Sequence, residues 1–224
     1  MSARKGSKKA SPRSPRSPKE LREEAKEILR ELEKEQKKSP KKEAPECPIC
    51  KSRKNWLEHV SWSREVGILI LLKVPKEVVN ASIARVLQNQ KDLGKWFADN
   101  LKNPSVGKEV TRLLTIHAKE EVKIVTGLRE SDPKLKKLQE DWNKNAVEIA
   151  DTISQAGQEH GFNWPDEELR DMMLMHLQLK TEQATKFYEG DYAGAVEAGD
   201  KVETEIIKLS DLLAKALEKE CGCS

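Results

Sequence analysis

The chain has 224 residues, of which 37% are hydrophobic and 35% are charged, and its formal net charge is +3. Its longest apolar run, from Val66 to Leu72, is far shorter than the roughly 20 residues that a bilayer span requires, so we expect no membrane-spanning helix. The first residues are basic without an apolar stretch, and we expect no secretory signal. Four cysteines are too few for a disulfide scaffold, which favours an intracellular, reducing compartment.

The charge divides the chain into a basic arm and an acidic body. Residues 1–54 hold 18 Lys/Arg and 9 Asp/Glu, a net charge of +9, so the remaining residues carry a net charge of −6. Residues 1–19 consist largely of Ser-Pro units followed by Lys or Arg and contain no acid. Because this segment has almost nothing apolar to bury, it is predicted to be a disordered basic arm.

Cations spaced along an extended arm can follow a phosphate backbone by releasing counterions. The unit Ser39-Pro40-Lys41-Lys42 resembles the short repeats of histone tails, which lie along the DNA minor groove. The alternatives are a solvated tail or contact with an acidic membrane or protein surface. The residues expected to contact phosphate, without sequence readout, are Arg4, Lys5, Lys8, Lys9, Arg13, Arg16, Lys19, Lys41 and Lys42.

A charged amphipathic helix is predicted over residues 20–38 because its few apolar residues form one narrow stripe. This helix could dock on the body, self-associate or bind a protein partner, or remain free. Residues 39–54 are predicted to be a basic linker, and residues 220–224 a Cys-Gly-Cys tail.

The linker contains Cys47 and Cys50 at the spacing of a zinc knuckle. A tetrahedral zinc site needs four ligands, and the only other cysteines are Cys221 and Cys223 in the tail. One interpretation is therefore a Zn²⁺ clip made by all four cysteines. Free thiols, a disulfide and a C-terminal prenylation site are the alternatives.

The body, residues 55–219, is predicted to be all-α, a six-helix antiparallel bundle built from three helical hairpins. Prolines stand where helices should begin, and apolar residues recur at the helical period between them. An even number of helices returns the chain to its starting end, where the tail cysteines would meet the linker cysteines. The predicted helices are residues 55–72, 76–99, 105–128, 133–157, 166–188 and 191–219.

Three histidines, His59, His117 and His176, fall in the first, third and fifth predicted helices at nearly equal intervals. Each lies about a dozen residues before the end of its helix, so all three are predicted at one level, roughly 17–20 Å from the same rim. The fourth, His160, is predicted to lie in a surface loop. The polar residues expected near this level on the return helices are Arg85, Asn89, Asn145, Glu148, Asp200 and Glu203.

This polar layer has two interpretations. Hydrogen-bonded histidines can fix the register of the helices, which is the more frequent role of buried histidine. Alternatively, the three imidazoles with Glu121, Asp200 and Glu203 could bind a first-row metal ion with an open position for water. Glu121 is a candidate because it stands four residues after His117, on the same helical face.

The chain shows no Gly-rich phosphate loop, no nucleophile beside a base at a recognisable spacing and no dinucleotide fingerprint. Catalytic residues are therefore not assigned. The tryptophans fall mostly on apolar stripes, which favours core packing over base stacking.

The body resembles a family of uncharacterised all-helical proteins found in Bacillus-type bacteria and large DNA viruses. The similarity covers about residues 56–215, and both ends of the chain depart from it. It implies no activity, but a viral setting would suit a DNA-associating arm in a nucleus, virus factory or virion. The motifs that carry the resemblance are Glu58-His59-x-x-Trp62-x-Arg64, Arg85-x-Leu87-x-Asn89-Gln90-x-Asp92-x-Gly94, His117, Trp142-x-x-Asn145-Ala146-x-x-Ile149-Ala150, His176-Leu177 and Gly190-Asp191-Tyr192.

The first functional hypothesis is a non-enzymatic, nucleic-acid-associating or structural protein, in which the arm contacts phosphate and the bundle is a packing or partner module. The alternative hypothesis is a metal-binding helical-bundle enzyme or sensor centred on the three histidines.

Overall fold

The computed structural model describes residues 23, 26, 27, 30 and 47–215 of the chain. Residues 1–45 and 46–224 form two separate units. In the first unit the four described positions, Glu23, Lys26, Glu27 and Arg30, are helical. The predictions for the basic arm, most of the helix at 20–38 and the Cys-Gly-Cys tail lie outside the described residues.

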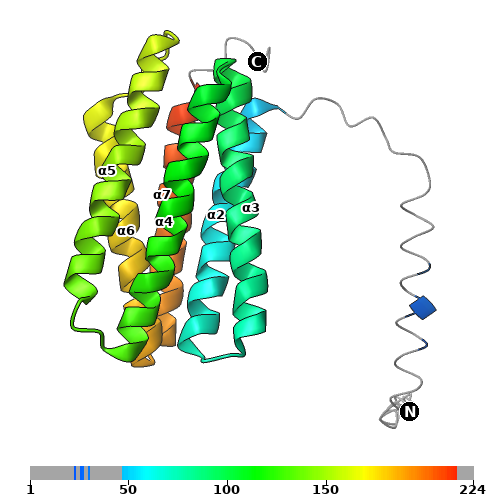
Figure 1. Cartoon of the computed structure of the whole chain (residues 1–224), viewed down its shortest axis with the longest axis vertical. Coiled ribbons are helices and arrows are strands. Elements are labelled where there is room, and N and C mark those ends of the chain that lie inside the picture. The colour runs from blue at the N-terminus through cyan, green and yellow to red at the C-terminus, as the bar shows by residue number, and fades with distance from the viewer. Residues whose placement is uncertain (1–22, 24–25, 28–29, 31–46, 216–224) are drawn as a thin grey trace, which may run out of the picture. The chain divides into compact units, whose positions relative to one another are not determined.

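The second unit contains six long helices and, over residues 47–215, no strand. The predicted six-helix antiparallel bundle is therefore confirmed (Figure 1). The helices are α2 (Pro48–Leu71), α3 (Lys76–Leu101), α4 (Pro104–Glu130), α5 (Leu135–Glu159), α6 (Asp166–Glu189) and α7 (Tyr192–Lys215).

The helices form a closed ring in chain order, in which each packs against the next and α7 packs against α2. In addition, α2, α4 and α6 contact one another across the inside of this ring. These three helices are the first members of the three hairpins, so they form an inner trio with α3, α5 and α7 between them. The inner trio is the set of helices that carries the three histidines.

Capping residues and prolines mark the helix starts, and two of the predicted starts are corrected by the structure. Asn103 caps α4 by accepting hydrogen bonds from the backbone N–H groups of Ser105 and Val106, and Pro104 follows in the first turn. Helix α2 begins at Pro48 and not near residue 55, so the end of the predicted linker is helical. Helix α5 begins at Leu135 and not at residue 133, because Asp132 Oδ1 accepts from the Lys134 N–H and holds a turn there.

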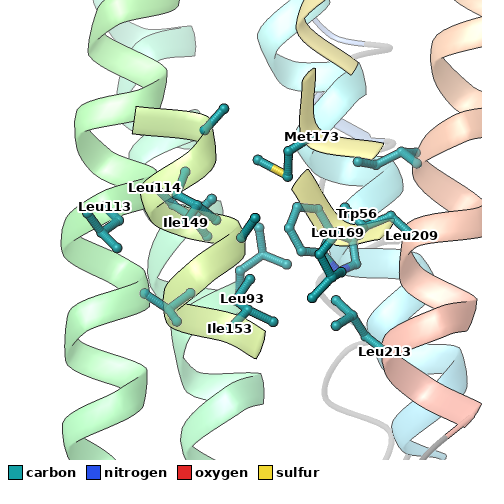
Figure 2. Packing of buried hydrophobic residues seen from close by; sticks show 14 of the residues in the cluster. Trp56, Leu93, Leu113, Leu114, Ile149, Ile153, Leu169, Met173, Leu209 and Leu213 are labelled. Carbon is teal, nitrogen blue, oxygen red and sulfur yellow. The ribbon is translucent and has the colours of Figure 1, made fainter. Parts of the chain in front are cut away.

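One large hydrophobic core joins all six helices, and tryptophans are among its largest fully buried side chains. Trp56, Trp96, Trp142 and Trp164 are buried to within 2% of full burial, which confirms that most tryptophans pack in the core. Figure 2 shows Trp56 of α2 among side chains contributed by the other helices. Among residues 47–215, no helix is long and apolar enough to cross a bilayer.

The start of α2 and the end of α7 lie together. The Arg53 guanidinium donates two hydrogen bonds to the Asp211 carboxylate, at 2.6 and 2.8 Å, and the hydroxyls of Ser52 and Ser210 are 2.9 Å apart. The prediction that the bundle returns the chain to its starting end is therefore confirmed for the described residues.

Helices α3 and α4 approach closely where Gly94 faces Gly107. A Cβ atom on Gly107 would lie 2.5 Å from the Cβ of Ala98 and 2.6 Å from the backbone oxygen of Gly94. Replacing Gly107 with alanine is expected to lower the free energy of unfolding by about 1–3 kcal/mol, because the two helices must move apart. Gly67→Ala is the matched control, since its Cβ would meet its nearest neighbour at 3.9 Å. Urea unfolding measures both changes, and equal effects would contradict the close approach.

Candidate metal centre

Three buried imidazoles meet inside the inner trio of helices. His59 of α2, His117 of α4 and His176 of α6 are each at most 2% exposed. The His59 ring centroid lies 6.2 Å from that of His117 and 5.9 Å from that of His176. One ring nitrogen from each lies within 4.8 Å of the corresponding nitrogens of the other two. The prediction that the three histidines share one level is therefore confirmed.

Two of the rings form hydrogen bonds through Nδ1 with side chains of the neighbouring helices α5 and α7. His117 Nδ1 lies 3.0 Å from Asn145 Oδ1, and His176 Nδ1 lies 3.1 Å from Glu205 Oε2. Because both partners are acceptor oxygens, Nδ1 carries the proton and donates in each case. In His117, whose ring burial keeps neutral, the lone pair is then on Nε2, which is buried without a hydrogen-bond partner. A buried acceptor without a partner is costly, and a cation would satisfy it.

His59 is held differently. Its Nδ1 lies 3.3 Å from Gln90 Nε2, which also donates to the Val86 carbonyl oxygen at 2.9 Å. As an acceptor at Nδ1, His59 carries its proton on Nε2. Binding a metal through Nε2 would move that proton to Nδ1, and rotation of the Gln90 amide would supply an acceptor. Gln90 Oε1 is available for this role because it is buried without a partner.

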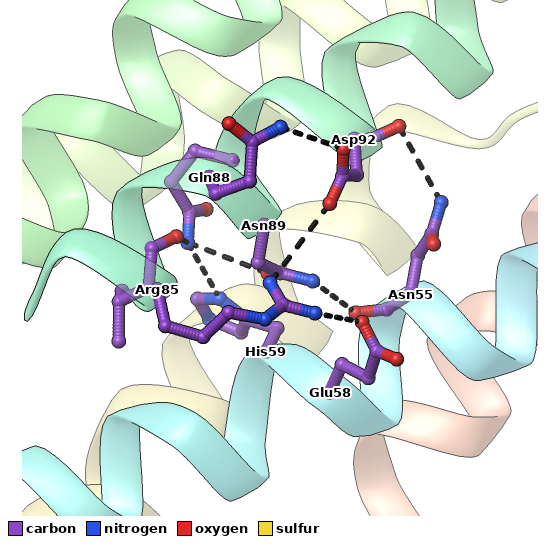
Figure 3. A network of polar contacts seen from close by, with 9 residues as sticks. Asn55, Glu58, His59, Arg85, Gln88, Asn89 and Asp92 are labelled. Carbon is purple, nitrogen blue, oxygen red and sulfur yellow. Dashed lines mark hydrogen bonds and ion pairs between the residues drawn. The ribbon is translucent and has the colours of Figure 1, made fainter. Parts of the chain in front are cut away.

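The same polar contact recurs in successive hairpins. Asn89 donates to the carbonyl oxygen of Asn55 at 2.9 Å, and Asn145 donates to that of Leu113 at 3.3 Å. Each of these carbonyl groups stands four residues before the histidine of its hairpin, and Figure 3 shows the arrangement around His59. In the third hairpin Glu205 stands at the corresponding place, but a carboxylate has no N–H to donate. Its Oε1 is buried without a partner.

A second buried polar layer, Ser63, Glu121 and Lys180, lies one helical turn beyond the histidines. Its members each stand four residues after a histidine of the trio. Lys180 Nζ contacts Glu121 Oε1 at 2.9 Å and donates to Ser63 Oγ at 2.8 Å. Glu121 is thus the partner of Lys180, and within the described part of the chain the candidate ligand set consists of the three histidines.

Burial keeps the imidazoles of His59 and His117 neutral. Desolvation lowers the pKa of His117 to about 4, helped by the neighbouring His176 and opposed by Glu121. Desolvation also holds the pKa of His59 well below its usual range, and the other two histidines act in the same direction. Both rings are therefore neutral near pH 7, which is the form in which histidine binds metals.

The remaining acids predicted near the histidines lie elsewhere. Asp200 is exposed, and Glu203 pairs with Arg64 at the surface, at 3.3 Å. The acid beside His176 is Glu205, which the sequence analysis missed. The interval between partners could have identified it, because Asn89 and Asn145 follow their histidines by 30 and 28 residues and Glu205 follows His176 by 29.

Two other polar residues predicted at this level bond elsewhere, half-buried Arg85 and exposed Glu148. Arg85 donates to Glu58 at 2.6 Å and lies over the Trp62 ring, 5.3 Å from its centroid. Figure 3 shows the hydrogen bond between Arg85 and Glu58. Glu148 pairs with Arg112 at 3.2 Å. Asn89 and Asn145 alone among the predicted return-helix residues reach the histidine layer.

The cysteine prediction is addressed only in part. Cys47 stands directly before α2 and Cys50 is exposed in its first turn, so the Cys-Pro-Ile-Cys segment opens a helix. Cys221 and Cys223 lie outside the described residues, and the four-cysteine zinc clip stays a prediction. His160 lies apart from the centre at the end of α5, where its Nδ1 donates to the Ala156 carbonyl oxygen at 2.8 Å.

Comparison with protein-family models, with curated proteins and with solved structures finds no match to this chain. The resemblance to the family of Bacillus-type bacteria and large DNA viruses therefore stays a prediction.

Proposed function

We propose that the bundle binds one first-row divalent metal ion, with zinc as the first candidate, through His59, His117 and His176. The observation that carries this proposal is the convergence of three buried imidazoles, of which His117 presents an unpartnered Nε2. Three protein ligands and one open position are the coordination typical of catalytic zinc, whereas structural zinc is closed by four. The site would thus suit an enzyme or a sensor that admits a further ligand.

A buried carboxylate beside the histidines favours a cation. Among the described residues, the buried side chains with a formal charge are Glu121, Glu205 and Lys180. Of these, Lys180 pairs with Glu121, whereas the buried Glu205 carboxylate contacts His176 Nδ1 and pairs with no lysine or arginine of the described chain. A carboxylate that accepts from the second ring nitrogen of a ligating histidine raises the basicity of that ligand, so Glu205 favours a cation at His176.

The contacts around the histidines also support metal binding. Metal-bound histidine usually donates its second ring N–H to a carboxylate or an amide oxygen, which fixes the ring and its tautomer. Glu205 and Asn145 accept from Nδ1 of His176 and His117 in this way. Hydrogen bonding alone would equally orient these rings, but it leaves His117 Nε2 without a partner.

Metal analysis of the purified full chain tests the proposal. We expect about one metal ion per chain in the unaltered protein and in His160→Gln, and loss of that ion in His117→Gln. His160 is the matched control because it is the one histidine of the chain that lies apart from the centre. Circular dichroism confirms that each variant remains helical.

Two outcomes would contradict the proposal. One is a chain that binds no metal when zinc is supplied. The other is a metal that His117→Gln retains and Cys47→Ser loses, which would assign it to the cysteines.

Association with nucleic acid is a separate prediction that concerns the arm. It depends on the net charge of +9 over residues 1–54 and on the Ser-Pro-basic units, and the phosphate-contacting residues lie outside the described part of the chain. It is compatible with a metal-binding bundle, because the two activities use different segments.

A further inference from the structure

A cavity of about 470 Å³ lies among helices α2, α4, α6 and α7. None of the three histidines lines it, so a molecule bound there would not be a ligand of the proposed metal centre. Volumes of this size are usual for small-molecule sites. Because a cavity of about 150 Å³ holds one benzene molecule, this one has room for a ligand of roughly a dozen carbon atoms.

The cavity is polar at its buried end and apolar along its walls. The buried end is formed by Ser63, Glu121 and Lys180. Tyr192 and Val196 also line the cavity but are 61% and 66% exposed, so they mark the side that is open to solvent. A ligand that matches this arrangement has a polar end and a longer apolar body. The other apolar side chains of the walls include Ile68, Leu71, Val125, Ala184 and Phe187.

The polar end of such a ligand should carry no charge. Lys180 Nζ contacts Glu121 Oε1 at 2.9 Å, and the two side chains are only 4% and 9% exposed. This ion pair already has no net charge. A carboxylate or an ammonium group placed against it would either be buried without a counter-ion or separate the pair, and both are costly.

Two hydrogen-bonding groups remain for a neutral oxygen. An ammonium group has three N–H donors, and within the described chain Lys180 has two acceptors, Glu121 and Ser63. The Gln183 amide also lines the cavity, and it forms no hydrogen bond with the described residues. It lies against Gly199, where a Cβ atom would come within 2.5 Å of its Nε2. A hydroxyl or carbonyl oxygen of a ligand can accept a hydrogen bond from either group.

We propose that this cavity binds a neutral, elongated molecule of roughly a dozen carbon atoms that ends in a hydroxyl or carbonyl oxygen, such as a medium-chain alcohol. The oxygen lies at Lys180, and the chain follows the apolar walls toward Tyr192 and Val196. The site is independent of the proposed metal centre. Because burial of each methylene group is favourable, each one added to the chain tightens binding roughly three- to fourfold until the cavity is full.

Isothermal titration calorimetry of the full chain with 1-hexanol, 1-octanol and 1-decanol tests the inference. Octanoate and octylammonium are the matched controls, because both are charged at neutral pH. We expect saturable binding of the alcohols, dissociation constants that fall with chain length, and binding of both charged ligands about tenfold or more weaker than that of 1-octanol. Absence of saturable alcohol binding, or affinity that is independent of chain length, would refute the site. Equally tight binding of either charged ligand would refute the neutral head group.

A filling variant locates the ligand. Ala184 lines this cavity and not the neighbouring one of about 320 Å³, which lies among α2, α3 and α4. We expect Ala184→Phe to bind 1-octanol about tenfold or more weakly, because the new ring occupies the space of several methylene groups. Ala81→Phe is the control, since Ala81 is exposed on α3. Unchanged binding by Ala184→Phe would place the alcohol elsewhere and overturn the proposal.

A variant at the open side tests the orientation of the ligand without disturbing the core. Val196 is largely exposed, so we expect Val196→Asp to remain folded. Only a long chain that starts at Lys180 reaches this residue, and we therefore expect weaker binding of 1-decanol and unchanged binding of 1-hexanol. The opposite pattern would place the hydroxyl at the open side, away from Lys180, and would contradict the proposal.

Discussion

Replacing Lys180 with methionine is expected to lower the free energy of unfolding of the metal-free protein by about 3–5 kcal/mol. The ammonium group contacts Glu121 at 2.9 Å, and the two side chains are only 4% and 9% exposed. Without Lys180, the Glu121 carboxylate is a buried charge with no counter-ion, and the Ser63 hydroxyl loses its donor. Urea unfolding followed by circular dichroism measures the loss.

The double variant Lys180→Met/Glu121→Leu is the control for this prediction. Removing both charges eliminates the unpaired carboxylate, so we expect the double variant to recover most of the lost stability. If the double variant instead shows the sum of both single losses, the pair is not a coupled, buried ion pair.

The metal-free protein is also expected to lose stability as the pH falls from about 6.5 to about 4. In the unfolded chain His117 takes up a proton near pH 6.5, but in the folded chain burial lowers its pKa to about 4. Between these values the unfolded state binds more protons, so protonation favours unfolding. His117 alone would contribute a loss of about 3 kcal/mol across this interval, and His59 adds to it in the same direction.

Urea midpoints at pH 7, 6 and 5 measure this dependence. Carboxylates also titrate toward the acid end of the interval, so the comparison with His117→Gln isolates the contribution of the imidazole. We expect a shallower fall in that variant and an unchanged fall in His160→Gln. Identical pH profiles for all three proteins would show that the His117 ring is not held neutral by burial.

Much of the bundle could be predicted because its helices are bounded by strong local signals. Gly190 adopts a left-handed backbone conformation at the end of α6, with φ of 84°, where glycine has no steric penalty. Asp166, Glu167 and Glu168 occupy the first turn of α6, where acids complement the helix dipole. The predicted start of α2 was wrong because residues 48–54 are mainly polar. The buried side chains at this end of the helix include Ser52 and Asn55, which are themselves polar. Small polar residues on a buried face leave no apolar period to detect.

The histidine layer could be predicted because the interval between equivalent residues is set by helix and turn lengths. Glu205, the acid partner of His176, could not be predicted in the same way, because residues two positions apart on a helix point about 200° apart. An error of that size in the helix register exchanges buried Glu205 for surface Glu203. The third hairpin also replaces the asparagine of the first two with a glutamate, so no common residue type marks the position.

Lys180 was missed for a different reason. Lysine is rarely buried unless it is paired, and a sequence does not show which acid would pair with it. Only the packing of α2, α4 and α6 brings Ser63, Glu121 and Lys180 together. The same packing shows why Glu121, a reasonable metal ligand by its spacing from His117, is already held by Lys180.

X-ray absorption at the zinc edge of the zinc-loaded full chain tests the central claim most directly. The account predicts three imidazole nitrogens about 2.0–2.1 Å from the ion, with one oxygen ligand and no sulfur. Zinc–sulfur distances near 2.3 Å, or fewer than three imidazoles around the ion, would show that the three histidines do not hold it.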